Sequence, residues 1–190
     1  MKPNNTKKQQ NRIKEEYATV LDVIMNTSNN FNSQNLIQAI GNKTYVLLEL
    51  VVKEGITIKV GDKVYIGEGK REQIQFIKRA IFPDKLTPGA KSELFYIIQD
   101  IVDEREEEYV NFFNIAGPIT IRKHAFEMIP GLGKKYLNNL LEEREKGPFK
   151  SFKEIGERCP YLSDPNKALS QRILDEIENK TDLKFFTRRE

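Results

Sequence analysis

The pattern of apolar residues changes once along this 190-residue chain, at the proline-bounded segment from Pro83 to Pro88. Before this segment, short runs of β-branched and aromatic residues are separated by turns that contain glycine. After it, apolar residues recur at the three- and four-residue spacing of an amphipathic helix. A strand has a side-chain period of two residues and a helix has a period of about 3.6, so one kind of secondary structure cannot account for both parts. The sequence therefore predicts a β-rich first part and a helical second part, which is the α+β class.

The first part is expected to form a small β-barrel. Several apolar runs have the composition of short strands: residues 18–24, 36–40, 45–52, 56–58, 63–66 and 73–81. Gly41-Asn42, between two of these runs, is typical of a hairpin turn. Short strands with glycine turns at this spacing favour a closed barrel, either OB-like or of another small type. Tyr45 or Tyr65 is a candidate stacking platform for single-stranded nucleic acid, and a buried, hydrogen-bonded tyrosine is the equal alternative.

The second part is expected to be all-α. Thr87-Pro88 is typical of a helix start, because threonine caps the first turn and proline suits the first helical position. Apolar residues then follow at helical spacing as far as Phe113, and Ala116-Gly117-Pro118 ends this helix. Similar capping chemistry predicts two later helix starts, at Ser151 and at Asp164.

These patterns divide the chain into four predicted segments. Residues 1–14 are expected to be a flexible basic arm, and residues 15–82 an OB-like β-barrel. Residues 86–180 are expected to form a helical domain, and the resemblance described below implies that it is a tandem helix-hairpin-helix domain whose second hairpin is degenerate. Residues 181–190 are expected to be a tail.

Composition argues against several classes of protein. A single cysteine, Cys159, excludes an internal disulfide and a cysteine-rich zinc site, and the single histidine, His124, leaves little material for a histidine-based catalytic centre. No apolar run approaches the roughly 20 residues that a membrane span needs, and the first residues lack the apolar stretch of a signal peptide. We therefore expect a cytoplasmic protein that is not an enzyme, needs no cofactor and does not contact a membrane.

Charge is distributed unevenly although the net charge is only +3. Residues 93–108 carry seven acids and one arginine, whereas residues 121–153 carry eight Lys or Arg against four acids. The basic residues of the C-terminal third and of the first 14 residues are thus separated by an acidic segment, which we expect to be a solvated helix face. A polyanionic partner is compatible with this distribution.

The segment Ile129-Pro130-Gly131-Leu132-Gly133-Lys134-Lys135 is the candidate binding motif. It lies between two apolar segments that we expect to be short helices, as in a helix-hairpin-helix. Each glycine removes a side chain where a phosphate can approach the backbone, and the first amides of the second helix point at the anion. Lys134 and Lys135 oppose the helix dipole, which favours acids in a first turn, and a phosphate between them explains their placement. A merely structural turn is the alternative.

Arg122 and Lys123, on the expected preceding helix, extend this motif or are simply solvated charges. The candidate nucleic-acid-binding residues are Pro130, Gly131, Leu132, Gly133, Lys134, Lys135, Arg122 and Lys123.

The order of this motif, the linker from Leu140 to Ile155 and a second turn resembles the tandem helix-hairpin-helix domain of competence-type DNA-uptake proteins. The second turn, Pro160–Pro165, lacks both glycines, so the resemblance implies a one-sided phosphate contact. From helix-hairpin-helix proteins generally, it implies phosphate contact at the amides of Gly131 and Gly133. It also implies a possible monovalent-cation site at three carbonyls, those of Glu127, Ile129 and Leu132.

A longer resemblance covers residues 17–186, to an archaeal family known as domain of unknown function 655. The segments that carry it are Glu16-Tyr17-Ala18, Val20-Leu21-Asp22, Gln38–Gly41, Leu47–Leu50, Val64–Gly67, Leu86-Thr87-Pro88, Phe112–Thr120 and Pro130–Lys135. The resemblance implies a small barrel before a helix-hairpin-helix domain, a nucleic-acid role and an archaeal cytoplasm. It implies no reaction.

The sequence thus predicts a non-catalytic protein that binds a nucleic-acid backbone largely without sequence preference. RNA is favoured over DNA by analogy with small barrels of translation. Two alternatives stay open: a DNA repair or recombination accessory factor, and a protein-interaction adaptor on the ribosome or a polymerase. The sequence does not determine the oligomeric state.

Overall fold

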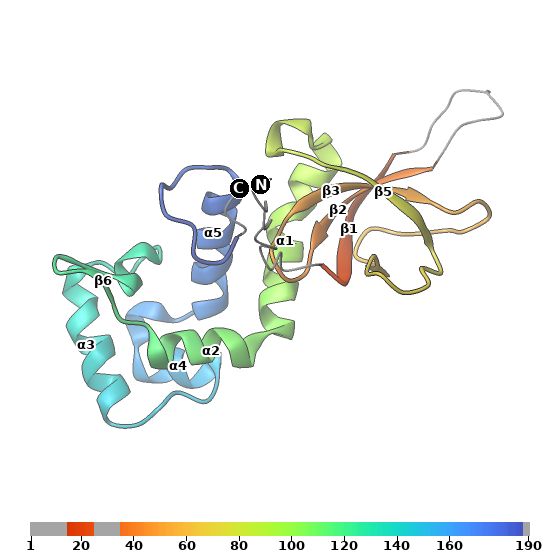
Figure 1. The fold of residues 1–190 in the computed structure, drawn as a ribbon. Coiled ribbons are helices and arrows are strands. Elements are labelled where there is room, and N and C mark those ends of the chain that lie inside the picture. Colours follow the sequence, from red (N-terminus) through yellow and green to blue (C-terminus); the bar gives the residue numbers. More distant parts are fainter. Residues whose placement is uncertain (1–14, 25–34, 188–190) are drawn as a thin grey trace, which may run out of the picture.

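The computed structural model describes residues 15–24 and 35–187, in which a curled five-stranded sheet lies beside five α-helices (Figure 1). The strands of the sheet are β1 (Tyr17–Ile24), β2 (Leu36–Gly41), β3 (Leu47–Val52), β4 (Lys63–Tyr65) and β5 (Ile74–Ala80). The α-helices are α1 (Pro88–Glu104), α2 (Glu106–Ile115), α3 (Lys134–Glu145), α4 (Phe152–Arg158) and α5 (Pro165–Ile177). Three single-turn 3₁₀ helices, η1 (Pro83–Lys85), η2 (Ala125–Met128) and η3 (Pro160–Leu162), and a ribbon of β6 (Pro118–Thr120) and β7 (Lys123–His124) complete the described elements. The predicted arm, residues 1–14, lies outside the described residues.

The sheet is antiparallel, with strand order β4-β1-β2-β3-β5, and its two end strands do not pair with each other in the described ranges. It is therefore a half-barrel rather than the closed barrel that the strand spacing favoured. Because β4 runs opposite to β1 and β5 runs opposite to β3, β4 and β5 run in the same direction. Parallel neighbours need a long crossover, and only residues 66–73 connect these two strands. Residues 56–58, predicted as a strand, lie in a loop that contributes Ile58 to the core.

The two faces of the sheet belong to different cores. One face encloses a cluster of small and branched side chains that includes Val20, Ile37 and Leu50. The other face packs against α1, which lies between the sheet and α5 (Figure 1). The central strands β2 and β3 are consequently buried on both sides, which explains their nearly continuous apolar sequence. The change from strands to helices falls between Ala80 and Pro88, where the sequence placed it.

The predicted long helix from Pro88 is interrupted at Arg105, which separates α1 from α2. The Arg105 guanidinium donates to the carbonyl of Asn42 at 2.8 Å and lies over the rings of Tyr45 and Tyr109, at 5.6 and 5.3 Å from their centroids. The two tyrosine hydroxyls are hydrogen-bonded to each other in the interior. Tyr45 has a φ of +58°, a conformation that a bulky side chain rarely adopts unless its surroundings impose it. These contacts of Arg105, Tyr45 and Tyr109, here called the Arg105 junction, attach the β2–β3 turn to the helices.

Two further features differ from the sequence-based expectations. The helical part is not all-α, because β6 and β7 form a two-stranded ribbon directly after α2. Residues 181–187, predicted as part of a tail, fold back onto α5, where the buried Glu176 carboxylate accepts the amides of Phe185 and Phe186 at 2.9 and 3.0 Å. Arg172 pairs with Glu176 at 2.9 Å and donates to the carbonyl of Leu183. The division of the chain into separate domains stays a prediction.

The hydrogen-bonded tyrosine pair of the Arg105 junction gives a test of this fold. Burial raises the pKa of Tyr45 to about 12, so both hydroxyls are protonated at neutral pH and one donates to the other. Tyr45→Phe leaves the Tyr109 hydroxyl buried without this partner, and we expect the free energy of unfolding to fall by about 1–3 kcal/mol. Urea unfolding of both single variants and of the double variant measures the coupling. Tyr96→Phe, at a side chain that is 64% exposed, is the control, and additive losses at Tyr45 and Tyr109 would contradict the pairing.

Candidate nucleic-acid interface

The segment from Ile129 to Gly133, here called the glycine turn, reverses the chain between η2 and α3. The Leu132 amide donates to the carbonyl of Ile129 at 3.0 Å, and both of these side chains are buried. Pro130, Gly131 and Gly133 are exposed. Gly131 has a φ of +87°, which favours glycine, whereas Gly133 has an ordinary φ of −72°, and a side chain there would meet no atom of the described residues within 4 Å. The buried side chains of Ile129 and Leu132 thus hold the turn against the core, and its glycine backbone is exposed to solvent.

The glycine turn ends in amides without acceptors. Gly133 is the N-cap of α3, and the first hydrogen bond of the helix is from the Tyr136 amide to its carbonyl at 2.9 Å. The amides of Lys134 and Lys135 precede that bond, so the helix offers them no acceptor. No described residue accepts from the amides of Gly131 or Gly133 either. These donors, at the positive end of the helix dipole, form a surface that suits an anion.

Two lysines stand beside these amides. Lys134 and Lys135 are exposed, and neither pairs with a carboxylate of the described residues. The Lys135 ammonium lies 5.5 Å from the centroid of the Tyr136 ring, which in turn stacks on Tyr161 with centroids 4.4 Å apart. The stacked rings of Tyr136 and Tyr161 connect α3 to η3, and the Lys135 ammonium lies beside the Tyr136 ring. Five of the predicted contact residues of the hairpin, Pro130, Gly131, Gly133, Lys134 and Lys135, are exposed close together, whereas the sixth, Leu132, is buried beneath them.

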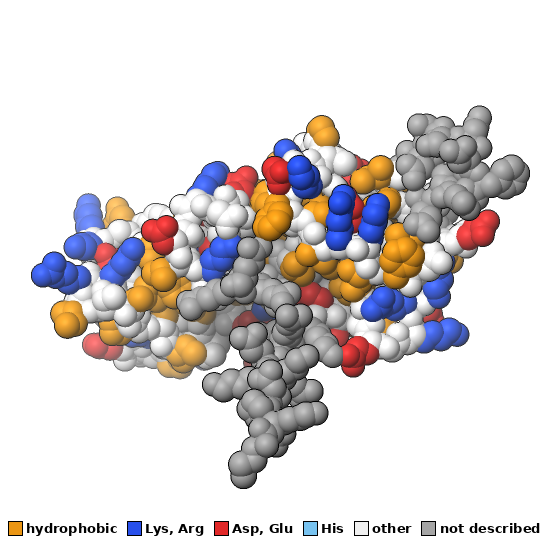
Figure 2. Space-filling view, turned by 45° about the horizontal axis from the view of Figure 1, so that its top comes forward, with side chains coloured by type: hydrophobic (Ala, Val, Ile, Leu, Met, Phe, Trp, Pro, Cys, Tyr) orange, Lys and Arg blue, Asp and Glu red, His pale blue; other side chains and the backbone are white. Residues whose placement is uncertain are grey.

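The ribbon of β6 and β7 lies at the same end of the molecule as the first turn of α3 (Figure 1). Arg122 and Lys123 are exposed at its turn and not on a helix as predicted, because the chain after Pro118 pairs with residues 123–124. Between Thr120 and Arg122, Ile121 is fully exposed at the tip. Figure 2 shows Lys and Arg side chains gathered at this end of the molecule. Sequence reasoning missed Ile121, and the signal was an aliphatic residue placed between a turn threonine and two cations.

Buried polar contacts hold the glycine turn from behind. His124 caps η2, since its Nδ1 accepts the Phe126 amide at 3.1 Å while Glu127 accepts the His124 amide at 2.8 Å. The segment predicted to be a helix before the turn is thus a single capped 3₁₀ turn. Arg172 of α5 reaches the carbonyl of Met128 at 3.2 Å. These groups fix the entry to the turn without using its exposed amides.

The second predicted hairpin has the opposite chemistry at its helix start. Asp164 caps α5 by accepting the Lys167 amide at 2.9 Å, so a carboxylate occupies the place where an anion would sit. On the helix before it, a side chain at Gly156 would approach the carbonyl oxygen of Ser163 to 2.9 Å. The glycine here serves close packing of α4 against the following turn.

The two tyrosines considered as stacking platforms, and one of the carbonyls considered for a cation, already have partners within the protein. Tyr45 is buried, so it is not the stacking platform that was considered. The hydroxyl of Tyr65 accepts from the amide of Gly69 at 3.0 Å, and its ring packs edge-on against Tyr17. Of the three carbonyls considered for a cation, that of Ile129 accepts the Leu132 amide, and the cation stays a prediction.

Within residues 15–24 and 35–187, no group of His, Cys, Asp or Glu side chains is arranged to hold a metal ion. No helix of these ranges has the length and apolar character needed to cross a membrane.

The fold and this surface define an α+β protein with a curled half-barrel sheet, five α-helices and an exposed basic glycine turn. The chain belongs to the family described as a protein of unknown function, DUF655, which matches residues 14–188. It is 37% identical over 172 residues to Uncharacterized protein MJ0038 of Methanocaldococcus jannaschii, across 90% of this chain and 78% of that one. The crystal structure of Af1531 from Archaeoglobus fulgidus matches 92% of this chain and 100% of its own, with 39% identity and a TM-score of 0.84. The family resemblance found in the sequence is confirmed.

The capping histidine predicts a pH effect on stability. Burial, and after it the Arg144 guanidinium, hold the pKa of His124 below its usual value, against the opposing effect of Glu127. As pH falls through the ordinary histidine pKa of about 6.5, the unfolded chain binds a proton that the folded protein resists, so stability is lost. His124→Asn retains an oxygen that can cap η2 but does not titrate. Between about pH 7.5 and pH 5.5, we expect the native protein to lose more unfolding free energy than this variant, and equal losses would contradict the assignment.

Proposed function

We propose that this protein is a non-catalytic nucleic-acid-binding protein that holds the phosphate backbone at the glycine turn, with RNA favoured over DNA. The observation that carries the proposal is that the backbone amides of Gly131, Gly133, Lys134 and Lys135, all at exposed residues, have no acceptor among the described residues. The helix-hairpin-helix description of residues 86–180 and the OB-like description of residues 15–82 are parts of the same proposal.

Electrostatics supports a phosphate at this turn. A helix N-terminus is positive, so two lysines in the first turn of α3 repel the dipole by about 0.3–1 kcal/mol each unless an anion lies between them. None of the described carboxylates neutralises Lys134 or Lys135. Arg122 and Lys123 add two further exposed cations at the same end of the molecule. A polyanion satisfies the amides and these cations at the same time.

The chemistry of the donors favours binding without sequence preference. Backbone amides and lysine ammonium groups recognise phosphate oxygens, which carry no sequence information. Affinity from such contacts falls as salt rises, because bound counterions are released from the nucleic acid. The preference for RNA rests on analogy with small barrels in translation. Duplex or junction DNA, and a protein partner, are the alternatives that the experiment below separates.

The test uses variants whose effects on stability and on binding have opposite signs. Gly133→Asp supplies the same N-cap that Asp164 gives α5, so we expect stability to rise by about 0.5 kcal/mol while affinity for nucleic acid falls. Lys134→Glu/Lys135→Glu also favours the helix dipole, and we expect affinity to fall about tenfold or more, with a salt dependence weaker by about two phosphate contacts. Fluorescence anisotropy with single-stranded RNA, duplex RNA and duplex DNA at two salt concentrations measures binding, and urea unfolding measures stability.

The matched control is Lys91→Glu/Lys167→Glu, which makes the same charge change at exposed lysines in the first turns of α1 and α5. We expect this control to change the affinity for nucleic acid much less than the Lys134→Glu/Lys135→Glu variant, here called the hairpin variant, does. If both double variants weaken binding equally, net charge and not the glycine turn is responsible. If the native protein binds none of the three ligands, the turn is structural and a protein partner is the better hypothesis.

A further inference from the structure

Strand β5 is exposed along almost its whole length. Among the described residues it pairs with β3 on one side only, and six of its seven residues are solvent-exposed, from Gln75 to Ala80. Phe76 is 40% exposed and Ile77 is 38% exposed. Natural sheets usually cover or charge such an edge, so a long edge strand with an exposed aromatic ring indicates a binding surface.

Two register shifts in the β3–β5 pairing determine what this surface presents. They place Phe76 opposite Val51 and Arg79 opposite Glu49. Residues directly opposite each other share a face of the sheet, so the Phe76 ring and the Arg79 guanidinium lie on the same face. Glu49, which is nearly buried, accepts from Arg79 at 2.8 Å and lies 3.9 Å from the Lys78 ammonium. The buried carboxylate orients the two exposed cations along the strand.

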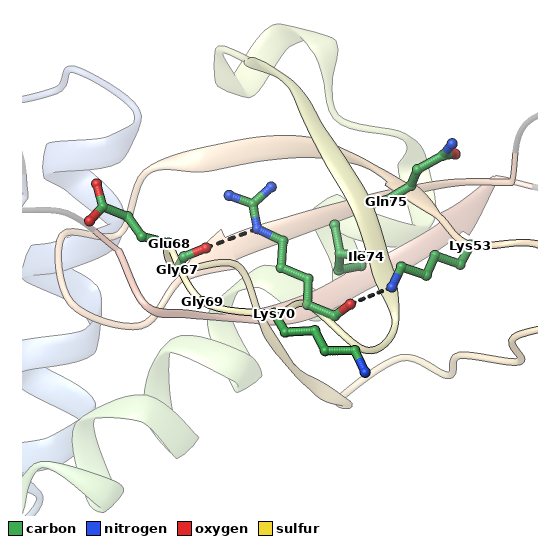
Figure 3. Close-up of a pocket in the computed structure, with 8 residues that line it drawn as sticks. Lys53, Gly67, Glu68, Gly69, Lys70, Ile74 and Gln75 are labelled. Carbon is green, nitrogen blue, oxygen red and sulfur yellow. Dashed lines mark hydrogen bonds between the residues drawn. The ribbon is translucent and has the colours of Figure 1, made fainter.

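A shallow cationic pocket opens at the start of β5 (Figure 3). It has a volume of about 320 Å³, and its lining residues are Lys53, Gly67, Glu68, Gly69, Lys70, Arg71, Ile74 and Gln75. Lys53 enters from the end of β3, and Lys70 follows the loop of Gly67 to Gly69, while Glu68 points away from both lysines. The pocket therefore has three cations and one carboxylate that is turned outward.

Local hydrogen bonds preorganise this pocket. Lys53 donates to the carbonyl of Arg71, and Arg71 Nε donates to the carbonyl of Gly67 at 3.0 Å. The terminal nitrogens of Arg71 and the ammonium of Lys70 have no acceptor among the described residues. A planar guanidinium held by its Nε and left free at its outer nitrogens is well suited to bind a phosphate.

We infer that this β5 surface, formed by Lys53, Lys70, Arg71, Phe76, Lys78 and Arg79, is a second nucleic-acid contact that takes a single-stranded segment. A phosphate occupies the pocket, and the same nucleic-acid strand passes over the exposed edge of β5. One of its bases then stacks on Phe76, whose ring lies on the other face of the sheet from the pocket residue Ile74. The inference rests on the proposed function only in that the ligand is a nucleic acid, and it names a different surface and a different form of that ligand.

The composition of the β5 surface favours a single strand over a peptide or a duplex. A cationic groove that follows a backbone, combined with an aromatic ring for stacking, is the usual arrangement for unpaired nucleic acid. In a duplex the bases are stacked on each other and leave no face for Phe76. A peptide that extended the sheet would use the backbone of β5 and would not need the three cations of the pocket.

The experiment compares a labelled single-stranded RNA with a duplex RNA of the same sequence by fluorescence anisotropy. Lys70→Glu and Phe76→Ser are the test variants, and both change exposed side chains. Lys91→Glu and Tyr96→Ser, at exposed positions of α1, are the matched controls. We expect each test variant to weaken single-strand binding about fivefold or more and to leave duplex binding within about twofold. Urea unfolding measures how much stability each substitution costs and checks that each variant is folded under the binding conditions.

The outcomes separate this inference from the proposed function. If Lys70→Glu and Phe76→Ser leave both affinities unchanged while Lys134→Glu/Lys135→Glu lowers them, the β5 inference is wrong and the glycine turn stands. If the β5 variants weaken single-strand binding and the hairpin variant changes neither ligand, the glycine turn is wrong and the β5 surface stands. Equal weakening of single strand and duplex by the β5 variants overturns the assignment to unpaired nucleic acid.

A second measurement uses the unsubstituted protein and so does not depend on variants. Ultraviolet crosslinking to a single-stranded RNA with photoreactive uridines, followed by mass spectrometry of the peptides, locates the bound bases. We expect crosslinks within residues 67–82 that an excess of unlabelled single strand abolishes and an excess of duplex does not. Crosslinks confined to other segments would overturn the inference.

Discussion

The junction at Arg105 determines how the rest of this molecule is arranged. A single guanidinium ends α1, bonds to the β2–β3 turn and lies over two tyrosine rings whose hydroxyls bond to each other. Burial of these hydroxyls is acceptable only because each satisfies the other, and the same contact holds Tyr45 at a positive φ. The sheet and the helices therefore meet through a polar contact in the interior, in addition to the apolar packing of α1 on the sheet. Such a contact specifies one geometry where apolar packing alone would allow sliding.

Two basic surfaces lie away from this junction. The glycine turn and the β6–β7 ribbon lie at one end of the molecule, and the sheet lies at the other (Figure 1). Neither surface contributes its cations to the junction, whose guanidinium and tyrosines are largely buried. The outer nitrogens of Arg71 and the ammonium groups of Lys70, Lys134 and Lys135 have no acceptor among the described residues, so they are available for an external anion. Two such surfaces on one rigid frame suit a ligand that is long and charged along its length, with a single-stranded part at the sheet.

Short-range chemistry was predictable from the sequence and long-range chemistry was not. The caps at Thr87, Ser151 and Asp164 all form, because each depends on residues three positions apart. The glycine turn was found for the same reason. The break at Arg105 and the burial of Tyr45 depend on partners dozens of residues away, so periodicity could not reveal them. The β6–β7 ribbon was missed because its strands are too short for an alternating pattern, and the open edge at β5 was missed because strand order is not written in local spacing.

The N-termini of α3 and α5, which follow the two predicted hairpin turns, differ in their charges, and this difference shows why the placement of charge matters. At α5 an aspartate caps the helix and satisfies its dipole, so that turn is complete without a ligand. At α3 the corresponding position is Gly133, and the next two residues are lysines, so the turn has neither a cap nor a favourable charge. A sequence selected only for stability would have an aspartate or serine at residue 133. In the proposed function, an anion completes this helix start from outside, because its charge and its hydrogen-bonding pattern suit the first amides of α3 and the two lysines.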